Sequence, residues 1–291
     1  MSLPRILITG KNGQVGFELA RTLAPLGNVT AVDVEECDLA DSTSVTRLVD
    51  DVCPDIIVNP AAYTAVDKAE TDRELAFAIN AMAPEVLANA AAKRNALMVH
   101  FSTDYVFDGT KEAPYTETDA PCPVSVYGES KLAGEKAVQL SGAQHLIFRL
   151  CWVYGTRGAN FLLTMQRLAK ERETLNIVND QFGAPTWCRT IAESTALILA
   201  QYQCCQFKQS GIYHMSAGGH TSWYEFAKAI FEMSPQKESF ALKEASPIPT
   251  SAYPTPARRP AYSVLSNERL QKTFGIQLPD WKTQLQMALE R

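Results

Sequence analysis

The sequence contains few of the features that mark secreted, membrane-spanning or metal-centred proteins. Its seven cysteines are odd in number and scattered, and no Cys-x-x-Cys occurs, which predicts reduced thiols in a cytoplasmic protein. The four histidines show no ligand spacing, which argues against a metal site built by the protein in its catalytic centre. No stretch approaches eighteen consecutive apolar residues and the N-terminus has no signal-peptide pattern, so neither a membrane span nor a secretory signal is predicted.

Positive charge is also scarce. The 27 lysines and arginines are outnumbered by 32 acidic residues, for a net charge of −5 over 291 residues, and no basic run occurs. This balance predicts no nucleic-acid partner and no membrane-surface partner. A hydrophobic content of 46% is enough for one large domain or two modest ones.

Strand-like and helix-like segments alternate through the first half of the chain. The predicted strands are RILITG (5–10), NVTAVD (28–33), PDIIVNPAA (54–62), ALMVHFST (96–103) and HLIFRL (145–150). The predicted helices cover 13–27, 41–52, 72–95 and the segment that contains VYGESKLAGEK (126–136). Such alternation with short connections predicts an α/β fold, a Rossmann-like doubly wound parallel sheet with helices on both faces.

The pattern loosens after about residue 155. Helical pieces at 160–172 and 223–233 alternate with short strands such as 211–215, and the segment 246–260 holds five prolines. Proline excludes a helix or a central strand there, which leaves either an ordered substrate loop or a disordered linker. We therefore predict a dinucleotide-binding Rossmann domain over 1–155, with some later segments returning to it, and a smaller α/β substrate domain over 156–291.

A glycine-rich turn separates the first predicted strand from the first helix. "GKNGQVG" places Gly10, Gly13 and Gly16 at G-x-x-G-x-x-G spacing. Glycine allows a tight turn and a close approach of pyrophosphate to the backbone, and the helix N-terminus offers free N–H groups to that anion. Because the turn lies between a strand and a helix, the motif predicts a dinucleotide site.

Asp33 closes the second predicted strand, 23 residues after Gly10. A carboxylate at that position accepts hydrogen bonds from the adenosine ribose hydroxyls and repels a 2′-phosphate, so it favours NAD over NADP. Asp38 and Leu39, after the next turn, are predicted to flank the adenine.

Tyr127 and Lys131 lie four residues apart in a helical segment, so they point to the same side of the helix. A Tyr-x-x-x-Lys pair alone is weak support for catalysis, but a dinucleotide site strengthens it. A ketone reductase needs a proton donor, and a nearby ammonium is expected to lower the ordinary pKa of tyrosine, about 10. Ser102 and Thr103, at the carboxyl end of the fourth strand, offer hydroxyls that could hydrogen-bond the developing alkoxide.

Seven motifs, the first of them the end of the glycine turn, together carry a family resemblance. They are "GQVG", "NPAAYTAVDKAE", "STDYVFDG", "VYGESKLAGE", "WVYG", "NDQFGAPT" and "YPTPARRP". The combination resembles the extended short-chain dehydrogenase/reductase superfamily and, within it, the dTDP-4-dehydrorhamnose reductase family. The resemblance runs from about residue 5 to about residue 282.

The resemblance implies the last step of dTDP-L-rhamnose synthesis, used for polysaccharides. Hydride from NADPH or NADH adds to C4 of a dTDP-4-dehydro-β-L-rhamnose substrate, Tyr127 protonates the new alkoxide, and Thr103 polarises the ketone. Substrate contacts are implied for Thr103, Asp104 and Trp152. Cofactor contacts are implied for Tyr127, Lys131, Gln14, Val15, Ala62, Tyr63 and Thr64.

Members of the family are also described with Mg²⁺ bridging a homodimer through acidic side chains. Glu18, in "GQVGFE", matches one of these acids. Arg189 follows "GAPTWC" where a second acid is expected. This departure argues against Mg²⁺ and against a metal-bridged homodimer.

Three alternatives stay open. One is a related nucleotide-ketosugar reductase with another product, and a second is a 4-epimerase or a 4,6-dehydratase. The third is a non-catalytic regulatory subunit resembling methionine adenosyltransferase beta.

In "YPTPARRP", Arg258 or Arg259 is expected to meet the substrate diphosphate, unless one of them pairs with a surface acid instead.

Overall fold

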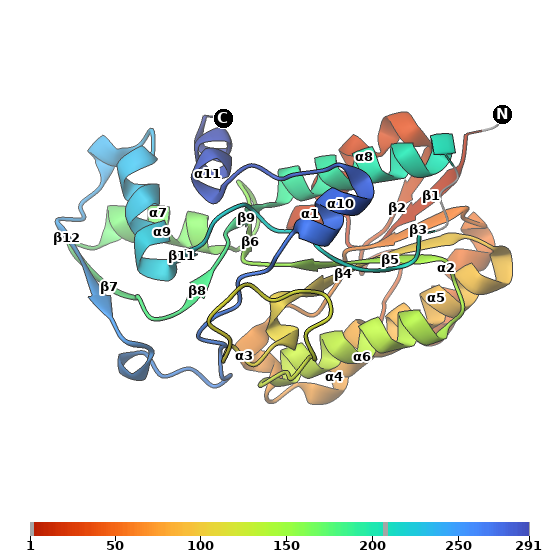
Figure 1. Cartoon of the computed structure of the whole chain (residues 1–291), viewed down its shortest axis with the longest axis horizontal. Helices are drawn as coiled ribbons and strands as arrows, with labels where there is room; N and C mark the ends of the chain where they lie inside the picture. The colour runs from red at the N-terminus through yellow and green to blue at the C-terminus, as the bar shows by residue number, and fades with distance from the viewer. Residues whose placement is uncertain (1–2, 206–208, 291) are drawn as a thin grey trace.

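The computed structural model describes residues 3–205 and 209–290. A six-stranded parallel sheet runs through the molecule (Figure 1), in the order β10-β5-β4-β3-β1-β2. Its strands are β1 (Arg5–Ile8), β2 (Asn28–Ala31), β3 (Ile56–Asn59), β4 (Leu97–Thr103), β5 (His145–Leu150) and β10 (Gly211–His214). The predicted α/β class with a doubly wound parallel sheet is confirmed.

Helices cover both faces of this sheet, as Figure 1 shows. On one face lie α2 (Ser42–Val52), α4 (Arg73–Phe77), α5 (Ala83–Arg94) and α6 (Val126–Leu140). On the other lie α1 (Gln14–Thr22), α8 (Cys188–Cys205) and α10 (Glu268–Phe274). Ile6 and Ile8 of β1 are buried in the core beneath α1 and α8, and Leu7 is buried beneath α2 and α5. This is the alternation expected of a strand covered on both faces.

The order of the strands reverses at β1, which has β3 on one side and β2 on the other. In open α/β sheets a crevice forms at such a reversal, beyond the carboxyl ends of the strands. The glycine turn, Asp33 and Thr103 all follow or end strands of this sheet, so the topology brings them to one edge.

The alanine-rich stretch Arg73–Arg94 is one continuous helical run with a π-helical turn at Ala78–Met82. Pro84 lies in the first turn of α5, where its missing N–H is tolerated. By length and composition alone the run is capable of crossing a membrane, a test that core helices of soluble proteins also pass. Here α5 packs against α2 and α6.

The rest of the chain forms a smaller, mixed region on the left of Figure 1. Its helices are α7 (Phe161–Glu171), α9 (Trp223–Met233) and α11 (Trp281–Leu289). Its paired strands are β7 (Thr174–Val178) with β12 (Glu244–Ile248), β8 (Phe182–Gly183) with β11 (Thr221–Ser222), and β6 (Val153–Tyr154) with β9 (Thr186–Trp187). The short α3 (Val66–Ala69) lies beside the large sheet's helices. The proline-rich segment begins in β12, a strand of a two-stranded sheet, where proline is tolerated.

Three later elements return to the large sheet. β10 pairs with β5, α8 packs on α1, and α10 packs on β10. The predicted division near residue 155 stays a prediction; the elements described here interleave along the chain rather than separate at one point.

A buried ion pair links α6 to β5. Arg149 donates to both carboxylate oxygens of Glu135, at 2.8 and 2.7 Å, and both side chains are almost fully buried. Two parallel N–H···O bonds make this a strong, geometrically specific contact. It holds the helix that carries Tyr127 against the sheet.

We expect Glu135→Ala to lower the free energy of unfolding by about 3–5 kcal/mol, because it leaves the Arg149 guanidinium buried without a counter-charge. Urea unfolding followed by circular dichroism measures the effect. Glu268→Ala is the matched control, since Glu268 pairs with Lys272 on the surface of α10 at 2.8 Å. That exposed pair is expected to contribute less than about 1 kcal/mol. Equal losses in the two variants would contradict a specific role for the buried pair.

Candidate active site

The glycine turn is shaped by two close approaches. Gly10 has φ +63°, and a Cβ there would lie 3.0 Å from Cα of Ala61. A Cβ on Gly16 would lie 2.0 Å from the Gly10 carbonyl oxygen, so only glycine fits at that position. Gly13 provides no side-chain cap to α1, which leaves the first-turn N–H groups directed at an anion site. The geometry fits a pyrophosphate cradle.

Two adjoining pockets open at the carboxyl edge of the sheet, with Gly10, Asp33 and Ala62 lining both. The smaller, of about 150 Å³, is also lined by Asp38 and Leu39. The larger, of about 640 Å³, brings together most of the other predicted residues. They are Gly13, Gln14, Val15, Gly16, Thr64, Thr103, Asp104, Tyr127, Lys131, Trp152 and Arg259.

Three predicted residues do not line either pocket. The Tyr63 hydroxyl donates to Asp72 at 2.9 Å, so the side chain serves to tie its own loop to the start of α4. Arg258 is exposed next to Arg259. Glu18 is half-buried on α1, one helical turn after Gln14, and lines neither pocket. These three residues lie close in the chain to residues that line the pockets, so nearness to a motif does not by itself place a side chain in a pocket.

Asp33 lies two residues beyond β2 and is fixed by backbone donors. Its two carboxylate oxygens accept hydrogen bonds from the N–H groups of Asn12 and Val34, both at 2.9 Å. The carboxylate therefore joins the glycine turn to the end of β2, at the border of the two pockets.

Tyr127 and Lys131 lie in the first half of α6, whose N-cap, Ser125, accepts from the Gly128 N–H. The Lys131 ammonium is buried and donates to the Phe101 carbonyl oxygen of β4 at 2.6 Å. Burial lowers the pKa of Lys131 to about 8, while Glu135 one turn on raises it. The amine is therefore still mostly protonated at neutral pH.

The predicted effect of Lys131 on Tyr127 is not what the structure shows. Burial raises the pKa of the Tyr127 phenol, a hydrogen bond with the Thr103 hydroxyl lowers it, and the charge of Asp104 raises it further. Lys131 directs its ammonium at the end of β4 instead of the phenol. The expectation of a lowered tyrosine pKa was wrong for this arrangement, because desolvation outweighs the remaining influences.

Thr103 ends β4 and its hydroxyl is engaged within the protein. It donates to Asp104 at 3.0 Å and accepts from the Tyr105 N–H at 3.1 Å. The Cys151 thiol donates to the other Asp104 oxygen at 3.2 Å. Burial raises the pKa of Asp104 to about 6, against hydrogen bonds from Ser263, Cys151 and Thr103 that lower it. A hydroxyl has one proton. Thr103 can therefore donate a hydrogen bond to a ketone only when its hydroxyl no longer donates to Asp104.

An aromatic pair that the sequence did not reveal forms another wall. Trp152 and Trp223 stack with ring centroids 3.5 Å apart and planes 6° from parallel, and both line the larger pocket. Trp152 has φ +45°, and a Cβ on Gly183 would lie 2.4 Å from its indole. No local signal could have found Trp223, because it starts α9, far along the chain.

The arginine segment is tied to α3, which carries Asp67. Arg259 donates to Asp67 at 2.8 Å and to the Tyr105 hydroxyl at 3.3 Å. The Ala257 N–H donates to the other Asp67 oxygen at 3.2 Å. The alternative in which one arginine pairs with an acid therefore describes Arg259, while its guanidinium still borders the pocket.

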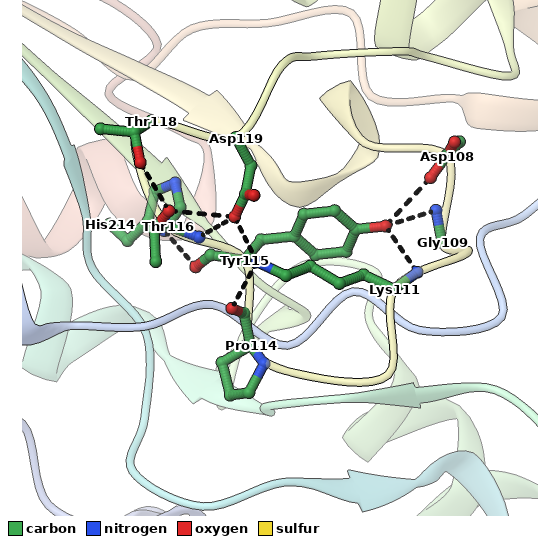
Figure 2. A network of polar contacts seen from close by, with 9 residues as sticks. All are labelled: Asp108, Gly109, Lys111, Pro114, Tyr115, Thr116, Thr118, Asp119 and His214. Carbon is green, nitrogen blue, oxygen red and sulfur yellow. Dashed lines mark hydrogen bonds and ion pairs between the residues drawn. The ribbon is translucent and has the colours of Figure 1, made fainter.

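A polar network stiffens the loop behind this segment (Figure 2). The Tyr115 hydroxyl accepts from the Gly109 and Lys111 N–H groups at 3.1 and 3.2 Å and donates to Asp108 at 3.0 Å. Gly109 has φ +79°, and a Cβ there would lie 2.6 Å from Pro260. The loop at Gly109 therefore packs closely against Pro260, the residue after Arg259.

The Mg²⁺ that the resemblance implied, and that Arg189 argued against, would bridge two chains, and the structure describes one chain. In the stretches 3–205 and 209–290, no group of three or more His, Cys, Asp and Glu residues is placed to hold an ion. Arg189, where an acid was expected, pairs with Glu193 at 2.7 Å.

Asp104 leads to a pH prediction. Its folded-state pKa of about 6 exceeds the ordinary aspartate value, so the folded chain binds this proton more tightly than the unfolded chain. The stability that this proton adds to the folded state is fully present below about pH 4 and is lost as the pH rises through about 6. We expect wild type to lose about 3 kcal/mol of stability relative to Asp104→Asn over this range, measured as urea midpoints. A pH-independent difference would show that Asp104 is ionised throughout.

Comparisons with known proteins agree with this geometry. The family model of the RmlD substrate binding domain matches residues 4–291. A dTDP-4-dehydrorhamnose reductase of Burkholderia thailandensis is 55% identical, covering 96% of this chain and 95% of its own. The Escherichia coli K12 enzyme of that name is 49% identical, covering 98% and 96%. A solved Bacillus anthracis dTDP-4-dehydrorhamnose reductase, in complex with NADP, superposes with TM-score 0.89 at 36% identity over 99% of both chains. The chain therefore belongs to the dTDP-4-dehydrorhamnose reductase family of extended short-chain dehydrogenases/reductases.

Proposed function

We propose that this protein reduces the C4 ketone of dTDP-4-dehydro-β-L-rhamnose to dTDP-L-rhamnose with NADPH or NADH. The observation that carries the proposal is one pocket of about 640 Å³ lined by the glycine turn and by Thr103, Tyr127 and Lys131. A dinucleotide cradle and a proton donor beside the same space are what a ketone reduction needs. The names of the relatives support the choice of substrate.

The nucleotide cofactor would lie along the carboxyl edge of the sheet. The N–H groups of the glycine turn and of α1 hold its pyrophosphate, Asp33 holds the adenosine ribose, and Asp38 and Leu39 border the adenine. When bound, the reduced nicotinamide supplies hydride. Lys131, anchored on Phe101, is placed at the inner end of the pocket to hold the nicotinamide ribose.

Tyr127 supplies the proton that the reduction requires. As the C4 carbonyl gains a hydride its oxygen becomes an alkoxide, and the Tyr127 O–H passes its proton to that oxygen. A phenol that is partly enclosed and has a raised pKa stays protonated until a strong base forms beside it, and an alkoxide is such a base. The raised pKa therefore suits a reductase, which needs the acid form at the start of each turnover. The phenolate left behind regains a proton from solvent.

Asp104 controls which hydrogen bonds Thr103 makes. With Asp104 ionised, the Thr103 hydroxyl donates its one proton to the carboxylate, so it has none to offer to the ketone oxygen. With Asp104 protonated, the carboxyl donates to Thr103, whose own proton is then free for the ketone oxygen. In both states Asp104 acts through Thr103 instead of contacting the sugar as the resemblance implied.

The remaining walls of the pocket suit a nucleotide sugar. The stacked indoles of Trp152 and Trp223 present a flat apolar surface to a 6-deoxysugar or to a base. Arg259 is placed to meet a phosphate oxygen once it shares or leaves Asp67. Arg258 is exposed and lines neither pocket.

One experiment separates this function from the alternatives. Purified protein is mixed with dTDP-4-dehydro-β-L-rhamnose, and the absorbance of NADPH and of NADH is followed separately. Stoichiometric oxidation with formation of the reduced sugar supports the proposal. An epimerase would recycle its cofactor and show no net oxidation, a regulatory subunit would show none either, and a related reductase would prefer another ketosugar.

We expect Tyr127→Phe to lower kcat by about 10²–10⁴-fold, the usual contribution of general acid catalysis. The affinity for NADPH should stay within a few-fold, because the ring and its packing are kept. Stopped-flow absorbance and fluorescence titration measure the two quantities. Wild-type turnover in this variant would contradict the role of Tyr127.

Arg259→Ala is expected to raise KM for the nucleotide sugar about tenfold to a hundredfold, the equivalent of one charge-assisted hydrogen bond of about 1.5–3 kcal/mol. KM for NADPH should change little. The matched control is Arg258→Ala, which removes the same charge from the adjacent, exposed position. If dTDP binds equally well to both variants and to wild type, Arg259 is structural and the diphosphate is held elsewhere.

A further inference from the structure

A single ion pair lies beside the carboxylate that is expected to hold the adenosine ribose. Lys11, inside the glycine turn, donates from Nζ to Oε1 of Glu36 at 2.5 Å. Oε2 of the same Glu36 accepts from the Asp33 N–H at 2.9 Å. Both side chains are partly exposed, by 31% and 43%. The neighbours of Lys11 in the chain, Gly10 and Asn12, line the larger pocket, so the pair stands at its rim.

The charges of this turn pose a problem for one of the two cofactors. Asp33, Glu35 and Glu36 follow β2 in close succession, and a 2′-phosphate on the ribose carries nearly two further negative charges. Asp33 cannot swing away easily, because backbone N–H groups of Asn12 and Val34 hold both its oxygens. The solved relative from Bacillus anthracis nevertheless contains NADP. A cation has to be available at this point of the site.

We propose that Lys11 is a cofactor-specificity residue that exchanges partners, pairing with Glu36 when NADH is bound and with the 2′-phosphate when NADPH is bound. The proposal deepens the proposed function and rests on it. The exchange lets one rigid ribose site accept both cofactors, because only a flexible, exposed lysine side chain has to move.

The energetics favour such an exchange. An exposed ion pair contributes little to stability, because water and salt screen it, so Lys11 leaves Glu36 at small cost. A phosphate offers a doubly charged acceptor with several oxygens, to which a lysine ammonium binds as a compact point charge. Glu36 keeps its second bond to the Asp33 N–H throughout, so the turn itself stays in place when Lys11 departs.

The test measures binding and does not depend on turnover. NADP⁺ and NAD⁺ are titrated separately into full-length protein by calorimetry. We expect Lys11→Met to weaken NADP⁺ about tenfold to a hundredfold, the usual effect of losing a charge-assisted contact, while NAD⁺ changes by less than about threefold. Lys11→Arg should restore NADP⁺ binding to within a few-fold of wild type. Raising the salt concentration should weaken NADP⁺ binding to wild type more than NAD⁺ binding, because salt screens the attraction between Lys11 and the 2′-phosphate.

A second variant tests the partner. Glu36→Gln removes the competing charge and keeps an oxygen for the Asp33 N–H, so NADP⁺ should bind several-fold tighter and NAD⁺ should be unaffected. The control is Lys243→Met, which breaks a similar exposed pair with Glu173, 2.8 Å long and outside both pockets; it should change neither cofactor.

Two results would overturn the proposal. Equal weakening of NADP⁺ and NAD⁺ in Lys11→Met would make Lys11 a brace of the glycine turn, and no loss of NADP⁺ affinity would place the 2′-phosphate elsewhere. Failure of the proposed function is distinguishable, since it would appear as normal cofactor binding without turnover of the ketosugar.

Discussion

The hydrogen bond from the Lys131 ammonium to the Phe101 carbonyl oxygen holds the catalytic geometry together. Lys131 is 2% exposed, and a buried charge persists only with good partners. The bond draws α6 onto the end of β4, and the Glu135–Arg149 pair one turn further draws the same helix onto β5. Tyr127 at the start of α6 is thereby set beside Thr103. Removing either contact would leave a charge stranded in the core, so the helix has little freedom to shift.

The predicted residues that the structure brings to one pocket owe their placement to short-range geometry. Gly10 and Gly16 are six residues apart, and their contact follows from one tight turn between a strand and a helix. Tyr127 and Lys131 share a helix face because their spacing is fixed by the helix period. Asp33 and Thr103 follow from parallel strands, whose carboxyl ends meet at one edge. The fold class follows from the same local alternation.

The parts that the sequence did not predict depend on contacts between distant segments. Nothing near Trp223 indicates that it stacks on Trp152, and nothing in "YPTPARRP" indicates that Asp67 holds Arg259. The pKa of Tyr127 was misjudged for the same reason: its value depends on how deeply the packing of other segments encloses the phenol. The strand Gly211–His214 falls in the range predicted for the substrate domain. In the structure it pairs with β5 and forms the last strand of the large sheet, so β5 is not left as an unpaired edge.

The two ends of the pocket are built on opposite electrostatic principles. At the catalytic end the charges of Lys131, Asp104 and Glu135 are buried, where a displaced partner costs several kcal/mol, so the geometry is nearly invariant. At the ribose end the Lys11–Glu36 pair is exposed, where rearrangement costs less than about 1 kcal/mol. A rigid end is needed because a misplacement of about 1 Å at the reacting atoms can lower the rate about a hundredfold. Rearrangement at the ribose end does not disturb catalysis, because in the proposed binding mode the adenosine ribose lies far from the bonds that change. Burying the charges at one end of the cleft keeps the catalytic side chains in place. Leaving the Lys11–Glu36 pair near solvent at the other end would let the same cleft accept both proposed cofactors.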